Sequence, residues 1–492
     1  MLWVLVMLLG IRTEALAPGI KAEITLKGLD YGKEVGMEFL NSALLKLSIP
    51  DLKGSYSIPL VGPVEWAMTG FQVKALNLGE SLIAFVPNSG LKLSMGPAEA
   101  EVDGHWSVVA SLIRDSGTLS LNVRDVTLAV QVGVHWNGAG RLVVSSEGCS
   151  SHIGRLEVTF HGGASWLYNI FFEVLEDLIR KQLNSKLCES IGNAVQTLER
   201  TLQTIPESRH ISPLADLNCS LVAAPLIMEQ SIELDFKGEF YSPASHKEFP
   251  VPPAPFSLWK QNDHMLLLGV SDFVANSAAF VYYQAGALSR TFNDSQIPKW
   301  FPIRLNTKNF KNFVPELQKR FPNTTMALKI FARLPPRLQS QSGALKVVLP
   351  GALQAFVLPK GNSAVPVFLL DMDTEASGQV FASGKNIGAS LKLTKAFWPL
   401  PQMSIMEPEP GLLPALEELS SQWPQLVLGP YLLWLCLALS FFCTCLIPIE
   451  ASFQGWREAR SWGPQALLGN MASLTDQLLL LGINAKPNCH SS

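Results

Sequence analysis

The amino-acid sequence predicts an α+β protein in which long antiparallel sheets are covered by amphipathic helices. Residues 64–160 show an almost uninterrupted strand and turn pattern, and residues 166–202 show one helical pattern without a proline. A similar order of strands and helices recurs after a proline-rich, extended linker at residues 249–255, although no residue-level repeat relates the halves. A chain of 492 residues most simply makes two domains, with room for a third.

The first 17 residues predict a secretory signal peptide, although the usual basic start is missing. An apolar core from Leu2 to Ile11 precedes Ala15-Leu16-Ala17, which has the small-x-small pattern of a signal-peptidase site. A buried first strand is the alternative, and Pro18-Gly19 disfavours it. Three sequons agree with a secretory route and are the expected glycosylation sites: Asn218, Asn293 and Asn323.

The composition favours an apolar interior and argues against a nucleic-acid partner. Charged residues make up 16% of the chain, below the typical ~25%, whereas the apolar share of 48% is ordinary. Apolar surface therefore outweighs polar surface more than usual, which suits an internal apolar cavity. The net charge of −3 and the lack of a basic run exclude the usual means of neutralising phosphates.

The elements before the long helix are predicted as one strand, one helix and a meander. Residues 20–26 alternate as a strand, and residues 31–47 predict a helix that ends before Pro50. Its apolar face consists of Val35, Phe39, Leu40 and Leu44. Turn signals such as Asn137-Gly138 divide the strands that follow.

A change of apolar parity inside the meander predicts a β-bulge. The apolar positions are first odd and then even: Leu119, Leu121 and Val123, followed by Val126, Leu128, Val130, Val132 and Val134. One strand can keep both sets on the same face only with an extra residue near Arg124-Asp125, and such bulges bend sheets. Two strands joined by a turn are the alternative.

The helix at 166–202 carries one long apolar stripe. Its members recur at three-and-four spacing: Trp166, Ile170, Phe171, Val174, Leu175, Leu178, Ile179, Leu183, Leu187, Ile191, Val195, Leu198 and Leu202. The opposite face is polar, with Glu173, Asp177, Arg180, Lys181 and Asn184, and Pro206 ends the pattern. A helix about 55 Å long needs an elongated partner. We expect dry core near Cys188 and the lid of a groove near Trp166 and Phe171.

Cys149 and Cys188 predict a disulfide that joins the long helix to the sheet. They are the only cysteines between the signal peptide and residue 200, and closing a loop of about 40 residues is worth ~4 kcal/mol in the chain-entropy model. A metal site at Cys149-Ser150-Ser151-His152 is the alternative, but no second ligand pair follows at zinc spacing. The pairing of the other five cysteines stays open: Cys219, Cys436, Cys443, Cys445 and Cys489.

The second half predicts further strands and two helices. Residues 217–241 are rich in strand patterns. The helices are expected at 273–286 and 310–321, and the strands at 265–270, 327–333, 344–349, 365–372 and 389–393.

No motif indicates catalysis, a cofactor or a metal. The chain has no Gly-x-Ser-x-Gly elbow, phosphate loop, dinucleotide fingerprint or His-Glu-x-x-His. His161-Gly162-Gly163 is superficially similar to a lipase oxyanion loop, but a tight turn is the better interpretation because no nucleophile elbow accompanies it. We therefore expect a protein that is not an enzyme.

Several strings resemble the family of bactericidal/permeability-increasing protein and lipopolysaccharide-binding protein. They are Pro18-Gly19-Ile20, Lys27-Gly28-Leu29-Asp30-Tyr31, Ile49-Pro50-Asp51, Cys149-Ser150-Ser151-His152, Lys237-Gly238-Glu239-Phe240-Tyr241 and Ser271-Asp272-Phe273. They run in family order over about residues 18–400. The resemblance implies a boomerang of two elongated barrels, each a highly twisted antiparallel sheet wrapped around a long helix, joined by a central sheet. It also implies an apolar pocket for acyl chains in each barrel, and Cys149 and Cys188 match the family's single disulfide.

The implied domains are an N-terminal barrel at 18–205, central strands with the linker at 206–260, and a C-terminal barrel at 261–492. The last contains an atypical apolar segment at 426–449. If its uncharged core, residues 431–447, spans a membrane, the chain is tethered. If residues 478–484 instead form the family's last strand in the central sheet, the protein is secreted. We expect secretion and keep the tether as the alternative.

The N-terminal charge departs from the family pattern. In the bactericidal branch, lysines cluster on N-terminal loops that meet the acidic lipid A head group. Here the matching stretches, residues 50–64 and 103–117, carry only Lys53 and Arg114, and residues 18–200 hold 15 Lys plus Arg against 19 Asp plus Glu, a net of −4. Electrostatic capture of lipopolysaccharide is therefore not supported, whereas acyl-chain binding depends on apolar area and is unaffected.

The expected function is a secreted lipid-binding protein that takes phospholipid or lipopolysaccharide acyl chains into apolar pockets, in innate immune recognition of Gram-negative bacteria. Expected partners are those lipids and a membrane or lipid-aggregate surface. A transfer protein without lipopolysaccharide specificity and a surface-active or scaffold protein without a ligand are the alternatives, with an esterase far behind. The expected lining is Leu40, Leu44, Leu121, Val123, Val126, Leu128, Val130, Phe171, Val174 and Leu175.

Overall fold

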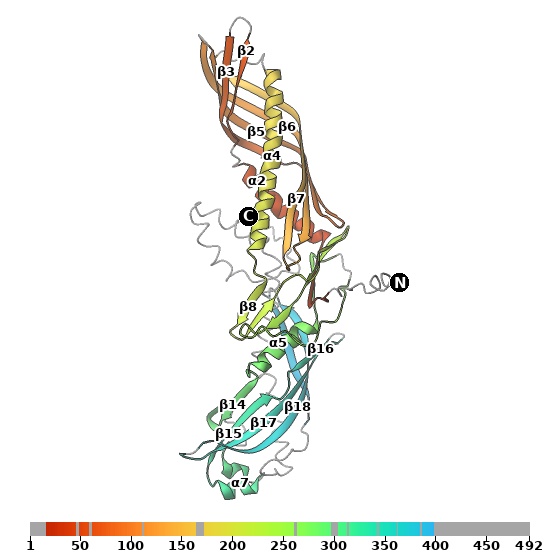
Figure 1. The fold of residues 1–492 in the computed structure, drawn as a ribbon, viewed down its shortest axis with the longest axis vertical. Coiled ribbons are helices and arrows are strands. Elements are labelled where there is room, and N and C mark those ends of the chain that lie inside the picture. Colours follow the sequence, from red (N-terminus) through yellow and green to blue (C-terminus); the bar gives the residue numbers. More distant parts are fainter. Residues whose placement is uncertain are drawn as a thin grey trace, which may run out of the picture.

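The computed structural model is an elongated α+β molecule with one long curved sheet near each end and smaller sheets between them (Figure 1). It describes residues 16–397 except 46–48, 59–61, 111–112, 164–171, 260–262, 297–303, 312–313, 342–343, 362 and 384–385. The predicted signal-peptide core and residues 431–447 and 478–484 lie outside this range. Within the described part, no helix has both the length and the apolar character needed to cross a membrane.

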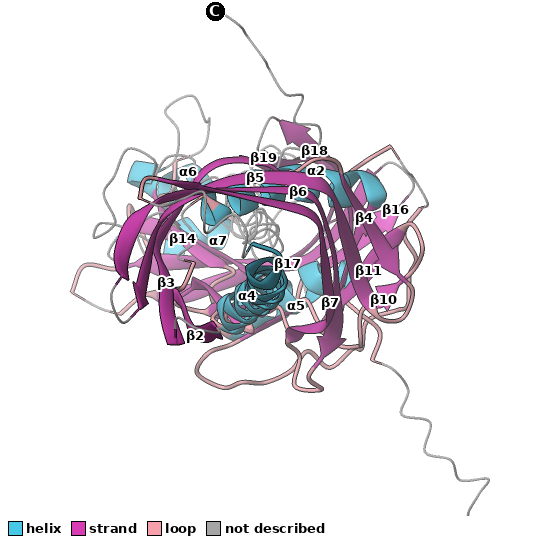
Figure 2. Ribbon diagram, turned by 90° about the horizontal axis from the view of Figure 1, so that it is seen from above, coloured by secondary structure: helices cyan, strands magenta, loops and turns pink. Residues whose placement is uncertain are grey.

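The N-terminal half is a six-stranded antiparallel sheet with the order β2-β3-β5-β6-β7, and β4 pairs with β5. Its strands are β2 (Leu52–Ile58), β3 (Gly62–Asn77), β4 (Ser81–Val86), β5 (Gly90–Ala110), β6 (Ile113–Trp136) and β7 (Leu142–His161). Seen along the long axis, the sheet curves around the long helix α4 (Figure 2).

Strand β6 is continuous through the change of parity, so the predicted bulge is confirmed. Both apolar sets point inward: Leu119, Leu121 and Val123, and Val126, Leu128 and Val130, are each 9% exposed or less. Asp125 has φ 56°, and the register against β5 shifts between Ala98 and Ala100. One residue in the left-handed conformation thus lets the strand keep its apolar face inward.

The two N-terminal helices begin and end differently from the prediction. The first, α2 (Leu26–Leu44), starts five residues earlier than expected. Leu26 N–H donates to the carbonyl of Gln230, and Gly28 N–H approaches Thr25 Oγ1 at 3.4 Å, so a distant strand supports its first turn. The long helix α4 (Phe172–Gln203) ends one residue later than predicted, and residues 166–171 lie outside the described structure.

Helix α4 is attached to β7, which is the edge strand of the sheet. The Cys149–Cys188 disulfide joins them with a Cα–Cα distance of 5.6 Å. Ser151 Oγ lies 3.1 Å from Asn184 Oδ1, and Arg180 Nη1 donates to the carbonyls of Ile153 and Gly154. Two residues of the predicted polar face therefore bind the edge strand: Arg180 donates to its carbonyls, and Asn184 accepts from the Ser151 hydroxyl.

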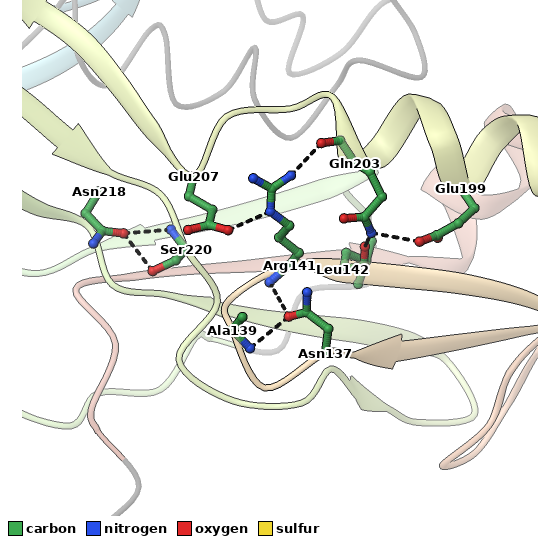
Figure 3. Close-up of polar contacts among 9 residues, drawn as sticks. All are labelled: Asn137, Ala139, Arg141, Leu142, Glu199, Gln203, Glu207, Asn218 and Ser220. Carbon is green, nitrogen blue, oxygen red and sulfur yellow. Dashed lines mark hydrogen bonds and ion pairs between the residues drawn. The ribbon is translucent and has the colours of Figure 1, made fainter.

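The end of α4 is tied to the centre of the molecule by Arg141 in the turn after β6 (Figure 3). Its guanidinium donates to the carbonyl of Gln203 and to the Glu207 carboxylate. Glu199 accepts from Val144 N–H at 2.6 Å. A cation at the carbonyl end of a helix is favourable, so this cluster both caps α4 and orients it.

The central sheet joins the two halves through the first strand. Strand β1 (Ile20–Thr25) pairs with β11 (Ser231–Phe236) on one side and β13 (Leu266–Val270) on the other, and β10 (Leu226–Ile227) extends the sheet beyond β11. A three-stranded sheet beside it consists of β8 (Ser208–Ser212), β9 (Ala215–Asn218) and β12 (Glu239–Tyr241). The linker at 249–255 has neither helix nor strand, as predicted.

The C-terminal half is a second six-stranded antiparallel sheet over a short helix. The helix α5 (Asp272–Gln284) is followed by β14 (Ser289–Asn293), η2 (Asp294–Gln296), α6 (Thr307–Phe310), α7 (Pro315–Arg320), β15 (Thr325–Ala332), β16 (Arg337–Gln341), β17 (Ala344–Leu358), β18 (Val365–Ser383) and β19 (Asn386–Phe397). The single helix predicted at 310–321 is wrong: it is two helices, because Pro315 begins a new one. Strands β17, β18 and β19 are longer than predicted.

Substitutions at Asp125 test the bulge. Replacement by glycine should change the free energy of unfolding by less than about 1 kcal/mol, and Asp125→Val should lower it by about 1–3 kcal/mol, because a β-branched residue is strained at this φ. Chemical denaturation measures both. Arg155→Ala is the control for loss of the exposed Arg155–Asp125 ion pair. Equal losses of unfolding free energy in the glycine and valine variants would contradict a bulge at Asp125.

A second test concerns the attachment of α4. Arg180→Met keeps the stem of the side chain but removes the donors to two edge carbonyls, so the free energy of unfolding should fall by about 1–3 kcal/mol. Lys181→Met is the matched control, because Lys181 is the exposed next residue, and it should stay within about 0.5 kcal/mol. Identical denaturation midpoints for the two variants would rule out the attachment.

Candidate functional site

The candidate site is the apolar interior between the concave face of the N-terminal sheet and helices α2 and α4. Five of the predicted lining residues form its floor and are buried: Leu121, Val123, Val126, Leu128 and Val130. The bulge at Asp125 lies between Val123 and Val126. Different residues of α2 and α4 pack against the floor on its two sides. The interior is therefore best described as two neighbouring groups of side chains.

The larger group lies toward the hairpin between β2 and β3. Leu121, Val123 and Val126 pack there with Leu52, Phe71 and Ile179, and Leu183 and Leu187 of α4 are only partly buried against it. Ile179 is 3% exposed, so this turn of α4 sits directly on the sheet. The stripe predicted from the sequence contains all three of these α4 residues.

The smaller group lies where α2, α4 and the sheet meet. Among the described residues, its buried members are Met95, Leu128 and Val130. Partly buried apolar side chains surround them: Met37, Leu40, Leu78, Val132, Cys149 and Ile191. Leu40 is thus brought to the site, whereas Leu44 is half-buried and belongs to neither group. Among the described side chains, most of this smaller group is therefore apolar and only partly buried.

An apolar recess marks where α4 meets the larger group. Its walls are Ile49, Pro50, Leu52, Phe71, Leu121, Ile179 and Leu183, with Gln182 and Lys186 at its rim. Its free volume is about 10 Å³, close to what one water molecule needs and far too small for an acyl chain.

Three of the predicted lining residues are not placed by the structure. Phe171 lies outside the described residues, and Val174 and Leu175 belong to α4 but their side chains are likewise outside the description. Within the described part of the stripe, Leu198 is 36% exposed and does not join the interior. The prediction missed Met37 and Met95, since methionine in an alternating or helical pattern carries no distinctive signal of its own.

The ionisable groups with displaced pKa values in the described structure lie away from the recess. Burial raises the pKa of Asp235 in the central sheet and of Tyr282 in α5. A hydrogen bond from Ser89 lowers the pKa of Glu147 on β7, assisted by Gln131 and His135. The described residues also form no group of three or more potential metal ligands. The recess can therefore hold apolar groups, but none of these displaced groups supplies acid–base chemistry to it.

Comparison with known proteins agrees with this architecture. The model of the LBP / BPI / CETP family, N-terminal domain, matches residues 28–204, and that of the C-terminal domain matches residues 209–433. The chain is 36% identical to the bactericidal permeability-increasing protein of Sebastes schlegelii over 80% of its own length and 83% of the relative's. It is 34% identical to the lipopolysaccharide-binding protein of Homo sapiens, over 79% of its own length and 81% of the relative's.

A solved structure shows the same fold. The crystal structure of lipopolysaccharide binding protein aligns with a TM-score of 0.54 and 27% sequence identity, covering 86% of this chain and 92% of that one. The predicted boomerang of two elongated barrels joined by a central sheet is confirmed. On the evidence of both domain models and of these relatives, the chain belongs to the LBP / BPI / CETP family.

Proposed function

We propose that this protein binds lipid, taking acyl chains of phospholipid or lipopolysaccharide into the apolar interior of the N-terminal barrel, in innate immune recognition of Gram-negative bacteria. The observation that carries the proposal is the long apolar interior between the N-terminal sheet and helices α2 and α4. Among the described residues, buried apolar side chains of the sheet face α2 and α4 and are bordered by half-buried apolar side chains. The names of the relatives, bactericidal permeability-increasing protein and lipopolysaccharide-binding protein, support the class of ligand.

The attachments of α4 suggest how a chain enters. The disulfide, Ser151 and Arg180 all connect the helix to the same edge strand β7, and no side-chain hydrogen bond between described residues connects it to β2 or β3. The helix can therefore swing about β7 and open the recess on the β2–β3 side. Each methylene group that enters contributes about 0.8 kcal/mol, which offsets the apolar contacts that α4 gives up.

The proposal is binding without catalysis. The walls of the recess carry no nucleophile or general base, and only Gln182 and Lys186 at the rim are polar. His161-Gly162-Gly163 ends β7 as a turn, with φ 82° and 57° at the two glycines. The recess supplies no nucleophile, so an oxyanion role for this turn has no support.

Secretion and glycosylation complete the proposal. Residues 1–17 are the proposed signal peptide, and the domain division at 18–205, 206–260 and 261–492 follows the family pattern. Asn293 and Asn323 are exposed in the C-terminal half and suit glycans. Asn218 is half-buried, and its Oδ1 accepts from Ser220 N–H and Oγ at 2.9 and 2.6 Å, which makes it the least accessible of the three sequons.

Lipid carried by the secreted protein tests the main claim. Native mass spectrometry should detect phospholipid that co-purifies with the wild type. Leu183→Asp places a charge at the recess and should abolish the adduct, whereas Leu198→Asp on the exposed side of the same helix should keep it. Leu183→Trp fills the recess without adding a charge. If it also loses the lipid adduct, the loss in Leu183→Asp does not reflect unfolding caused by a buried charge. If the wild-type protein carries no lipid, the lipid-binding proposal is wrong and the scaffold alternative remains.

Salt dependence tests how lipopolysaccharide is recognised. Residues 50–64 and 103–117 carry only Lys53 and Arg114 as lysine or arginine, so affinity should fall less than about threefold between about 50 and 500 mM NaCl. Binding to immobilised lipopolysaccharide measures this, with Lys53→Gln/Arg114→Gln as the control. A steep loss with salt would show electrostatic capture, and binding of phospholipid alone would favour a transfer protein without lipopolysaccharide specificity.

A further inference from the structure

A polar hollow lies on the outer face of the N-terminal sheet, on the opposite side from the lipid interior. It is shallow and largely open to solvent. It is lined by Thr69 on β3, by His105, Trp106 and Ser107 on β5, and by Ser116, Gly117 and Thr118 on β6. None of the relatives' names or domain descriptions assigns a role to this face.

Strand register brings these side chains together. Thr69 pairs with His105, His105 with Thr118, and Ser107 with Ser116, so their side chains share one face on adjacent rungs. The register of β3 shifts between Thr69 and Gln72, and Gly70 in this bulge has φ 65°. A glycine in the bulge leaves no side chain beside His105, whose ring would lie 3.2 Å from an added Cβ.

The wall behind the hollow is rigid. Trp106 is 3% exposed, its ring packs edge-on against Phe160 at 5.9 Å, and Nε1 donates to the carbonyl of His161 at 3.2 Å. The hydroxyl groups of Thr69, Ser107, Ser116 and Thr118 make no hydrogen bond to another described residue, so they can bond to a ligand. The strand behind the hollow is therefore held in place, and the hydroxyl groups of its lining are open to solvent and to a ligand.

The chemistry of the lining selects the ligand class. Four hydroxyl groups and one imidazole each donate or accept, and the lining contains no lysine, arginine or carboxylate. Asp103 on the same face accepts from Ser120 Oγ at 3.1 Å, and its negative charge disfavours anions. We propose that this hollow binds a neutral saccharide, whose hydroxyl groups also donate and accept. The site is independent of the acyl-chain interior.

Saturation-transfer NMR on the full secreted protein tests the site with maltose, lactose and N,N′-diacetylchitobiose. At least one should bind, and Ser116→Ala/Thr118→Val should weaken it about tenfold, the loss expected for two hydrogen bonds. Thr159→Val makes the same change on the outer face of β7, outside the hollow, and should leave affinity within about twofold. Thr69→Tyr fills the hollow and provides a second loss-of-binding variant if the double variant unfolds.

Two further outcomes decide the matter. Binding of none of the three disaccharides, or displacement of the sugar by sulfate, would overturn the proposal. Phosphatidylcholine vesicles with and without galactosylceramide then separate the sources: tighter binding to the glycolipid vesicles assigns a membrane glycolipid, and binding of the soluble sugar alone assigns a free glycan. Equal binding to both vesicles with no response to soluble sugar would count against the site.

Discussion

The N-terminal half of this protein depends on the burial of one side of a long helix against one long sheet. Helix α4 has 32 residues and is therefore about 48 Å long. No small sheet can cover such a length, and β5, β6 and β7 are 20 to 24 residues each. A flat sheet would touch the helix along a line. The bulge at Asp125 lets β6 bend while its apolar side chains stay inward, so the sheet curves around the helix instead.

The same helix is attached unevenly, and the proposed function follows from that asymmetry. Its side-chain bonds and its disulfide lead to β7, and its end is held by Arg141, whereas its contact with β2 and β3 consists of apolar packing. Apolar packing is not directional and can be exchanged for an acyl chain with little net cost. Hydrogen bonds to edge carbonyls cannot be exchanged in that way, because the carbonyls would lose their partners. The geometry thus separates a fixed side from a side that can open.

The two faces of the N-terminal sheet serve different chemistry. Alternation along β5 sends Val102, Gly104 and Trp106 inward and Asp103, His105 and Ser107 outward. The inward set meets the helices and forms the lipid interior, and the outward set contributes to the polar hollow. Strand β1, which leads into α2, joins the two halves through its pairing with β13 in the central sheet.

Much of the fold was predictable because hydrophobic periodicity is local. The apolar stripe of α4, the bulge in β6 and the floor residues from Leu121 to Val130 follow from spacing alone. Other features required partners far along the chain. Helix α2 begins at Leu26 because Gln230 accepts its first N–H, and Arg180 turns to β7 because that strand is an edge. The hollow at His105 joins residues from three strands, and no pattern within one strand marks it. The sequence by itself determined which side chains face inward, since burial alternates with the backbone period. Only the tertiary structure decided which polar groups meet, since hydrogen-bond partners are set by strand order and register rather than by spacing.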